Sequence, residues 1–107
     1  MQMQQIRYFL ALCEERNFTR AARRCGVSQP SLTNAMTALE RELGGALFQR
    51  RPEIALTVLG HAVHPYFQRI AENAEHARDA AQANVRPANR EAAPPELDTR
   101  NSLSPSG

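Results

Sequence analysis

The chain has 107 residues, a net charge of +2 and no Trp. A chain of this length holds one compact domain at most, which excludes a multidomain enzyme. Because only 6% of its residues are aromatic, its core must rest on aliphatic side chains and a few Phe. No segment approaches the roughly 20 apolar residues of a membrane-spanning helix, and the first residues lack a basic-then-apolar signal pattern, so we expect a cytoplasmic protein.

Charge and composition divide the chain near residue 86. All 13 cationic side chains are Arg, and the planar guanidinium suits bidentate contacts with phosphate or guanine. Residues 1–86 carry 11 Arg against eight acidic residues, giving +3, whereas residues 87–107 carry two against three, giving −1. Residues 87–107 also hold four of the seven Pro and few apolar residues, which predicts a disordered tail.

Two helices are predicted in the first quarter of the chain. Apolar residues recur at helical spacing in the first segment, which predicts a helix over about 2–16. Asn17 is a favourable N-cap and Gly26 is a favourable C-terminal stop. A second, short helix is therefore expected over 18–25.

The third predicted helix, over about 28–43, carries the functional information. Ser28 is a suitable N-cap, and Gly44 ends the helix. At about 100° per residue, one face is apolar and consists of Leu32, Met36, Leu39 and Leu43. The opposite face consists of Pro30, Thr33, Asn34, Thr37 and Arg41, with Gln29 and Ser31 close by. Short hydroxyl and amide groups hydrogen-bond to base edges and phosphates, which favours a helix that enters the major groove. The alternative is the solvated polar face of any amphipathic helix.

The second and third helices, joined by a tight turn, form a helix-turn-helix arrangement. Residues 46–51 and 54–56 are predicted as two short strands, which makes the unit a winged variant. Arg50 and Arg51 at the turn of this wing would reach a minor groove or flanking phosphates, or else remain solvated.

A long helix follows Thr57, which is a suitable N-cap. Apolar residues recur along it at spacings of three and four, and they form a stripe too long for so small a domain to cover. Such a stripe usually meets a partner helix, so we assign it to dimerisation. Its residues are Leu59, Val63, Tyr66, Ile70, Ala74 and Ala77, with Ala81 beyond them.

No catalytic or metal site is predicted. His61 and His64 lie three residues apart, but no carboxylate or thiolate completes a tetrahedral set nearby, so solvent-facing histidines are expected. Cys13 and Cys25 lie in apolar-patterned segments without CxxC spacing, which favours buried, reduced thiols over a disulfide. No nucleophile, base and orienting group occur together, so we expect neither an enzyme nor a cofactor.

Five linked segments resemble the N-terminal domain of LysR-type transcriptional regulators in order and spacing. They are residues 17–22 (NFTRAA), 27–33 (VSQPSLT), 39–44 (LERELG), 47–50 (LFQR) and 56–60 (LTVLG). The resemblance covers residues 1 to about 86. It implies a mainly α fold, in which a winged helix-turn-helix of three helices and a two-stranded wing precedes a long linker helix. The implied regions are a DNA-binding domain over 1–57, a linker and dimerisation helix over 58–86 and a tail over 87–107.

The resemblance also implies partners and individual contacts. Double-stranded DNA is the expected partner, and pairing of linker helices gives a homodimer on two-fold related half-sites. Family members continue into a longer domain that binds a small-molecule effector, which we do not expect in this chain. The DNA-contact residues implied by position are Ser28, Gln29, Pro30, Ser31, Thr33, Asn34 and Thr37 on the recognition helix and Arg50 and Arg51 on the wing.

Two alternatives to a sequence-specific regulator stay open at this point. In the first, the linker helix captures full-length relatives in heterodimers, and the chain is an interaction protein. In the second, the abrupt change of composition at Pro87 reflects a slipped reading frame, and the chain is a truncated remnant without a selected role.

Overall fold

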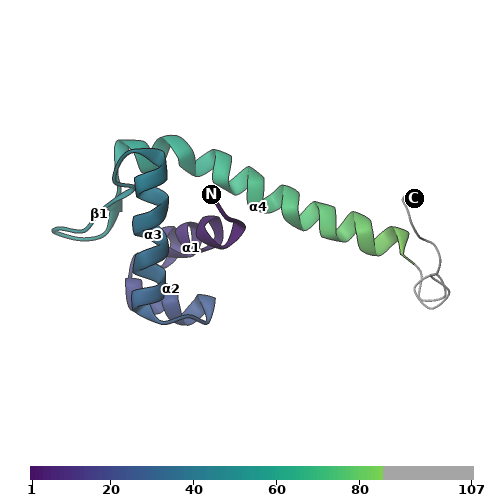
Figure 1. The fold of residues 1–107 in the computed structure, drawn as a ribbon, viewed down its shortest axis with the longest axis horizontal. Helices are drawn as coiled ribbons and strands as arrows, with labels where there is room; N and C mark the ends of the chain where they lie inside the picture. Colours follow the sequence, from purple (N-terminus) through teal and green to yellow (C-terminus); the bar gives the residue numbers. More distant parts are fainter. Residues whose placement is uncertain (86–107) are drawn as a thin grey trace. The chain divides into compact units, whose positions relative to one another are not determined.

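A computed structural model describes residues 1–85 of the chain (Figure 1). The fold is mainly helical, as predicted, and a long helix follows three helices and a two-stranded wing. The elements are α1 (Met3–Glu15), α2 (Phe18–Cys25), α3 (Gln29–Leu43), β1 (Phe48–Gln49), β2 (Ala55–Leu56) and α4 (Val58–Asn84). Residues 1–72 form one compact unit, and the rest of α4 belongs to a second unit. The predicted tail over 87–107 lies outside the described residues.

The helices α2 and α3 begin and end where their capping residues predict. The Asn17 side chain accepts a hydrogen bond from the Arg20 backbone N–H at 2.8 Å, and Ser28 caps α3 in the same way. Gly26 and Gly44 follow the two helices with φ angles of 72° and 88°, a left-handed conformation that glycine adopts without steric cost. The predicted bounds of α2, residues 18–25, are therefore confirmed, and its two capping residues account for them.

The wing strands are shorter than the predicted ranges 46–51 and 54–56. β1 and β2 pair in antiparallel fashion, and each has two residues. The Thr57 hydroxyl donates to the Ala46 carbonyl oxygen at 2.6 Å, and the Thr57 N–H donates to the Leu47 carbonyl oxygen at 3.0 Å. The first two residues of the predicted strand therefore bind the residue before α4 instead of β2, which shortens the ladder.

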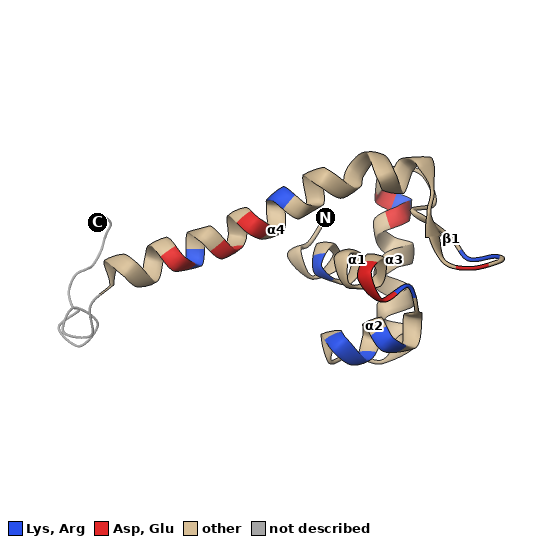
Figure 2. Cartoon of the chain, turned by 180° about the vertical axis from the view of Figure 1, so that it is seen from behind, with Lys and Arg blue, Asp and Glu red and all other residues tan. Residues whose placement is uncertain are grey.

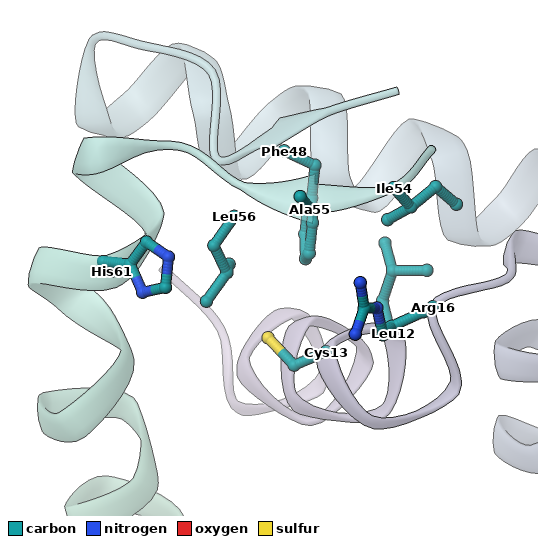
Figure 3. Close-up of a pocket in the computed structure, with 8 residues that line it drawn as sticks. All are labelled: Leu12, Cys13, Arg16, Phe48, Ile54, Ala55, Leu56 and His61. Carbon is teal, nitrogen blue, oxygen red and sulfur yellow. The ribbon is translucent and has the colours of Figure 1, made fainter. Parts of the chain in front are cut away.

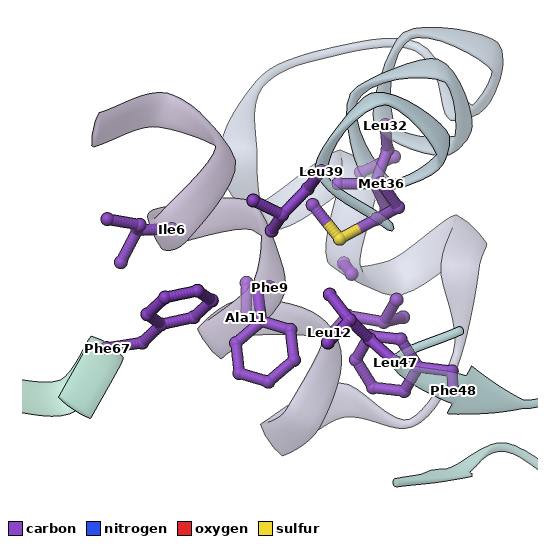
Figure 4. Close-up of a cluster of buried hydrophobic side chains, with 12 residues drawn as sticks. Ile6, Phe9, Ala11, Leu12, Leu32, Met36, Leu39, Leu47, Phe48 and Phe67 are labelled. Atoms are coloured by element: carbon purple, nitrogen blue, oxygen red, sulfur yellow. The ribbon is translucent and has the colours of Figure 1, made fainter. Parts of the chain in front are cut away.

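One hydrophobic core joins α1, α2, α3, the wing and the start of α4 (Figure 4). Its buried side chains are Ile6, Phe9, Ala11, Leu12, Ala21, Ala22, Leu32, Met36, Leu39, Leu47, Phe48 and Phe67. The ring centroid of Phe9 lies 5.3 Å from that of Phe48 and 5.2 Å from that of Phe67, the latter edge to face. Such tilted contacts are favourable geometries for aromatic pairs. The apolar face predicted for α3 is confirmed, because three of its four residues are fully buried and Leu43 is half-buried.

The first turns of α4 approach this core through Gly60 and Phe67, which are its buried residues. Thr57 caps the helix, since its Oγ1 accepts from the Gly60 N–H at 3.0 Å. A Cβ at Gly60 would overlap the carbonyl oxygen of Leu47, so the lack of a side chain permits this close approach. Pro65 lies inside the helix without ending it.

The apolar stripe predicted along α4 divides between two environments. Leu59 and Val63 are half-buried and pack against the core. Tyr66 and Ile70, in contrast, are 60% and 36% exposed. Phe67 was not part of the predicted stripe, yet it is 3% exposed and supplies the main core contact of α4. The side of α4 that faces the core therefore includes Phe67, which lies outside the predicted stripe.

The cysteines and histidines differ in part from the expectation. Cys13 and Cys25 are free thiols, but they are half-buried because each borders a surface pocket. Burial, assisted by the charge of Glu14, raises the pKa of the Cys13 thiol to about 12. His64 is half-buried, with its ring centroid 6.0 Å from that of Phe9, whereas solvent exposure was expected. Within the described part of the chain, no three metal-ligating side chains gather, and no helix is long and apolar enough to cross a bilayer.

Candidate nucleic-acid interface

The polar side chains of α3 that were predicted to contact DNA lie away from the core. On the core side, Leu32, Met36 and Leu39 are buried. The exposed candidates are Ser28, Gln29, Pro30, Ser31, Asn34 and Thr37. Thr33 is half-buried. The exposed side of α3 thus presents short hydroxyl and amide groups, which can approach a base edge closely.

Hydrogen bonds within α3 and from its N-cap residue fix the direction of several of these groups. The Ser28 hydroxyl donates to Ser31 Oγ at 2.9 Å. Thr37 Oγ1 donates to the carbonyl oxygen of Thr33 at 3.0 Å. A hydroxyl has one donor and two acceptor lone pairs, so Thr37 retains its acceptor capacity toward solvent. An acceptor at this place suits the amino group of adenine or cytosine in a major groove.

Gln29, the first residue of α3, is held by the preceding helix. Thr19 Oγ1 donates to Gln29 Oε1 at 3.0 Å. The contact joins the first turns of α2 and α3, and it leaves both hydrogens of Gln29 Nε2 available as donors. Sequence reasoning did not identify Thr19 as a site residue. The available signal was its position in the first turn of the helix that precedes the recognition helix.

Arginines lie on α2 and on the wing, and the first half of α3 carries no charge (Figure 2). Arg24 pairs with Glu14 at 2.6 Å and with Glu15 at 3.2 Å, and Arg20 lies 3.4 Å from Glu15. Arg23 makes no ion pair within the described residues. Since carboxylates of α1 partly neutralise two of the three α2 arginines, Arg23 keeps most of the free positive charge of that helix.

The two wing arginines have different surroundings. Both side chains are exposed, but the Arg50 guanidinium carbon lies 4.6 Å from the ring centroid of Phe18, and Arg51 has no aromatic contact in the described structure. Arg16 Nη2 and Glu53 Oε1 lie 3.4 Å apart, and both side chains are exposed. Two contacts therefore connect the wing to the junction of α1 and α2, and neither was predicted from the sequence.

A pocket of about 230 Å³ lies between α1, the two wing strands and the start of α4 (Figure 3). It is lined by Leu12, Cys13, Arg16, Phe48, Ile54, Ala55, Leu56 and His61. The lining is mainly apolar and includes none of the predicted DNA contacts. The pocket and the polar side of α3 are therefore separate features of the compact unit.

Comparison with known proteins relates this geometry to a family. Residues 3–61 match the model of the bacterial regulatory helix-turn-helix proteins of the lysR family. The chain is 41% identical over 87 residues to the HTH-type transcriptional regulator TcbR of Pseudomonas sp. (strain P51), an alignment that covers 80% of this chain and 30% of TcbR. It is 37% identical over 87 residues to BudR of Klebsiella aerogenes, covering 80% of this chain and 61% of BudR. The chain thus spans less than two thirds of the length of either relative.

Solved structures give the same relation in three dimensions. The structure of the CbnR DBD–DNA complex has a TM-score of 0.73 and 41% identity, and the match covers 80% of this chain and all of that one. The BenM DBD in complex with catB site 1 DNA has a TM-score of 0.74 and 30% identity, with the same coverage. Both neighbours are complexes with DNA, and both match the part of this chain that contains α3 and the wing.

Proposed function

Because the chain belongs to the LysR family of bacterial helix-turn-helix transcriptional regulators, we propose that it binds double-stranded DNA sequence-specifically, with α3 in the major groove. The family consists of regulators and not of enzymes. A protein that acts on bacterial DNA works in the cytoplasm, where we place this one.

The observation that carries the proposal is the exposed side of α3. Its N-terminal half has no acidic side chain, and Glu40 and Glu42 occur only in the last turns. The first turn of a helix carries unpaired N–H groups and partial positive charge, which favour nearby phosphates. Such a helix can place its first turns against DNA without electrostatic repulsion, while its carboxylates remain farther from the duplex.

The proposed contacts fall into two classes. Uncharged groups on α3 read base edges or donate to phosphates, and wing arginines contact the adjacent backbone or minor groove. The residues are Ser28 at the N-cap of α3, Gln29, Pro30, Ser31, Thr33, Asn34 and Thr37 on α3, and Arg50 and Arg51 on the wing. Because only the arginines neutralise phosphate charge, specificity and salt dependence should respond to different substitutions.

We further propose that two copies pair through α4. One recognition helix covers only a half-site, and a two-fold dimer places a second one on the same duplex. Exposed apolar side chains on α4 support this, above all Tyr66 and Ile70. Leu59 and Val63 contribute less, because they already contact the core of their own subunit. The proposed set also includes Ala74 and Ala77, which lie in the second unit of the chain.

Selection from a random pool of duplex DNA, followed by binding titrations, tests the DNA-binding proposal. The parent protein should enrich a two-fold related site and prefer it over random duplex. The double variant Gln29→Ala, Thr33→Ala should lose much of that preference, since each good base contact contributes about 1–3 kcal/mol of discrimination. A matched control is Gln4→Ala, Gln68→Ala, which removes two exposed amides elsewhere. If the α3 variant binds as selectively as the parent and the control, the proposal fails.

Sedimentation of the purified protein tests pairing. The parent should sediment as a dimer at micromolar concentration, and Ile70→Glu should shift it to monomer. The control Gln68→Glu introduces the same charge at a neighbouring exposed position of α4 and should stay dimeric. A monomeric parent would contradict pairing between copies. Mixing the parent with a full-length relative then shows whether α4 pairs with relatives in heterodimers.

A further inference from the structure

The Phe18 ring lies beneath the guanidinium of Arg50. Arg50 follows β1, and Phe18 is the first residue of α2, so the contact connects the wing to the helix-turn-helix. The Arg50 Cζ lies 4.6 Å from the ring centroid, within the roughly 6 Å over which a guanidinium is attracted to an aromatic face. Phe18 is itself half-buried and packs against the hydrophobic core, so the ring is a fixed support for a side chain that is otherwise exposed.

We propose that Phe18 is a positioning residue for DNA binding: its ring holds the Arg50 guanidinium ready for a phosphate or minor-groove contact. This inference rests on the proposed function, because it assigns Phe18 to the same interface. Phe18 itself need not touch DNA, since it acts through Arg50.

The geometry leaves Arg50 free to bind. The ring contacts only one side of the guanidinium, which carries five N–H donors in a planar fork. The donors that point away from the ring can therefore bind a phosphate while the ring contact is kept. Restricting the side chain before binding reduces the conformational entropy lost in the complex, which strengthens binding without a new contact to DNA.

A second tie between the wing and the α1–α2 junction supports this role. Arg16 Nη2 and Glu53 Oε1 lie 3.4 Å apart on the other side of the wing turn. Both side chains are exposed, so this pair alone contributes little. The contact of Arg50 with Phe18, which has a core-packed partner, is the firmer of the two ties.

Arg51 is the internal control for the proposal. It is the next residue, it carries the same charge, and it is exposed, but the described structure gives it no aromatic contact. Substitution of Phe18 should therefore change the behaviour of Arg50 and leave that of Arg51 unchanged.

A double-substitution cycle measured by DNA titration tests the proposal. Phe18→Leu, which keeps an apolar side chain in the core, should weaken binding about two- to fivefold, the equivalent of the roughly 0.5–1 kcal/mol of an exposed cation–π contact. In an Arg50→Ala background, Phe18→Leu should have no further effect. In an Arg51→Ala background, its full two- to fivefold effect should remain. Phe18→Tyr keeps the ring and should bind like the parent, which separates positioning from loss of folding.

A measurement without DNA accompanies the cycle. In NMR spectra of the free protein, the ring current of Phe18 should shift the Arg50 side-chain protons upfield relative to those of Arg51, and Phe18→Leu should remove the difference. If Phe18→Leu weakens binding equally with and without Arg50, or if the two arginines have the same proton shifts, the inference is wrong while DNA binding by α3 stands. A parent protein that binds no DNA would overturn the proposed function and this inference together.

Discussion

Replacement of Gly60 by Ala should destabilise the protein, although alanine is the better helix former. In an exposed helix interior, the change from Gly to Ala stabilises by about 1 kcal/mol. At Gly60 the added Cβ would overlap the Leu47 carbonyl oxygen and would lie 2.8 Å from Leu56 Cδ2. The carbonyl group cannot move away freely, because it accepts the Thr57 N–H at 3.0 Å. Overpacking of this kind costs up to about 3 kcal/mol, so the net loss should be about 2 kcal/mol.

Thermal unfolding followed by circular dichroism, at one fixed protein concentration, measures this loss. For a domain of this size, about 2 kcal/mol corresponds to a fall in Tm of about 8–16 °C. Gly45→Ala is the matched control. Its Cβ would meet only Leu59 Cδ2 at 3.0 Å, a side-chain atom that can rotate away, so its Tm should change much less. A Gly60→Ala protein as stable as the parent would refute the argument that this contact needs glycine.

Three further predictions concern stability and its dependence on pH. Phe67→Ala should lower the free energy of unfolding by about 3–5 kcal/mol, measured by urea denaturation, because Phe67 is 3% exposed. Tyr66→Ala should lower it far less at concentrations where the protein is monomeric. Equal losses would contradict the orientation of α4. Asn17→Ala removes the acceptor of the Arg20 N–H at 2.8 Å and should lower the free energy of unfolding by about 1 kcal/mol, and no loss would mean that this cap is dispensable. In the folded protein the pKa of the Cys13 thiol is raised from 9.0 to about 12, so the folded state binds this proton more tightly than the unfolded state. The stability that this group contributes is therefore fully present below pH 9 and is lost as the pH rises toward 12. Cys13→Ala should show a shallower loss of Tm above pH 9, and an identical slope would contradict the assigned cause.

Elements whose ends depend on neighbouring residues could be predicted from the sequence. Asn17, Ser28 and the glycines after α2 and α3 act within one or two turns of where they stand, so capping chemistry alone places these helix ends. The buried side of α3 could be predicted for a similar reason, since Leu32, Met36 and Leu39 repeat at helical spacing.

Features that depend on distant residues could not be predicted in this way. The wing strands are short because Thr57 binds the backbone of residues 46 and 47, and periodicity contains no information about that competition. On α4, two apolar stripes overlap in the sequence, and spacing alone does not show which one meets the core. The stripe that contains Phe67 meets the core, because the Phe67 ring packs edge to face against the ring of Phe9.

In the candidate site, too, features set by neighbouring residues could be predicted and contacts between distant residues could not. The exposed polar side of α3 could be predicted from helical geometry. The contacts of Thr19 with Gln29 and of Phe18 with Arg50 could not, because each joins residues from different elements. Both missed residues lie at the start of α2, which packs against α1 and α3 and so brings its first turn next to the interface.

The central claim is that uncharged side chains of α3 read the sequence while arginines supply the attraction to phosphate. The most direct test compares the selected DNA sites and the salt dependence of binding for Gln29→Ala and Arg50→Ala. Gln29→Ala should relax the preference at one position of each half-site and leave the slope of log affinity against log salt unchanged. Arg50→Ala should keep the preference at the positions read by α3 and reduce that slope by about 0.9, the value for one phosphate contact. An unchanged site preference in Gln29→Ala, with affinity reduced equally for all sequences, would contradict the account.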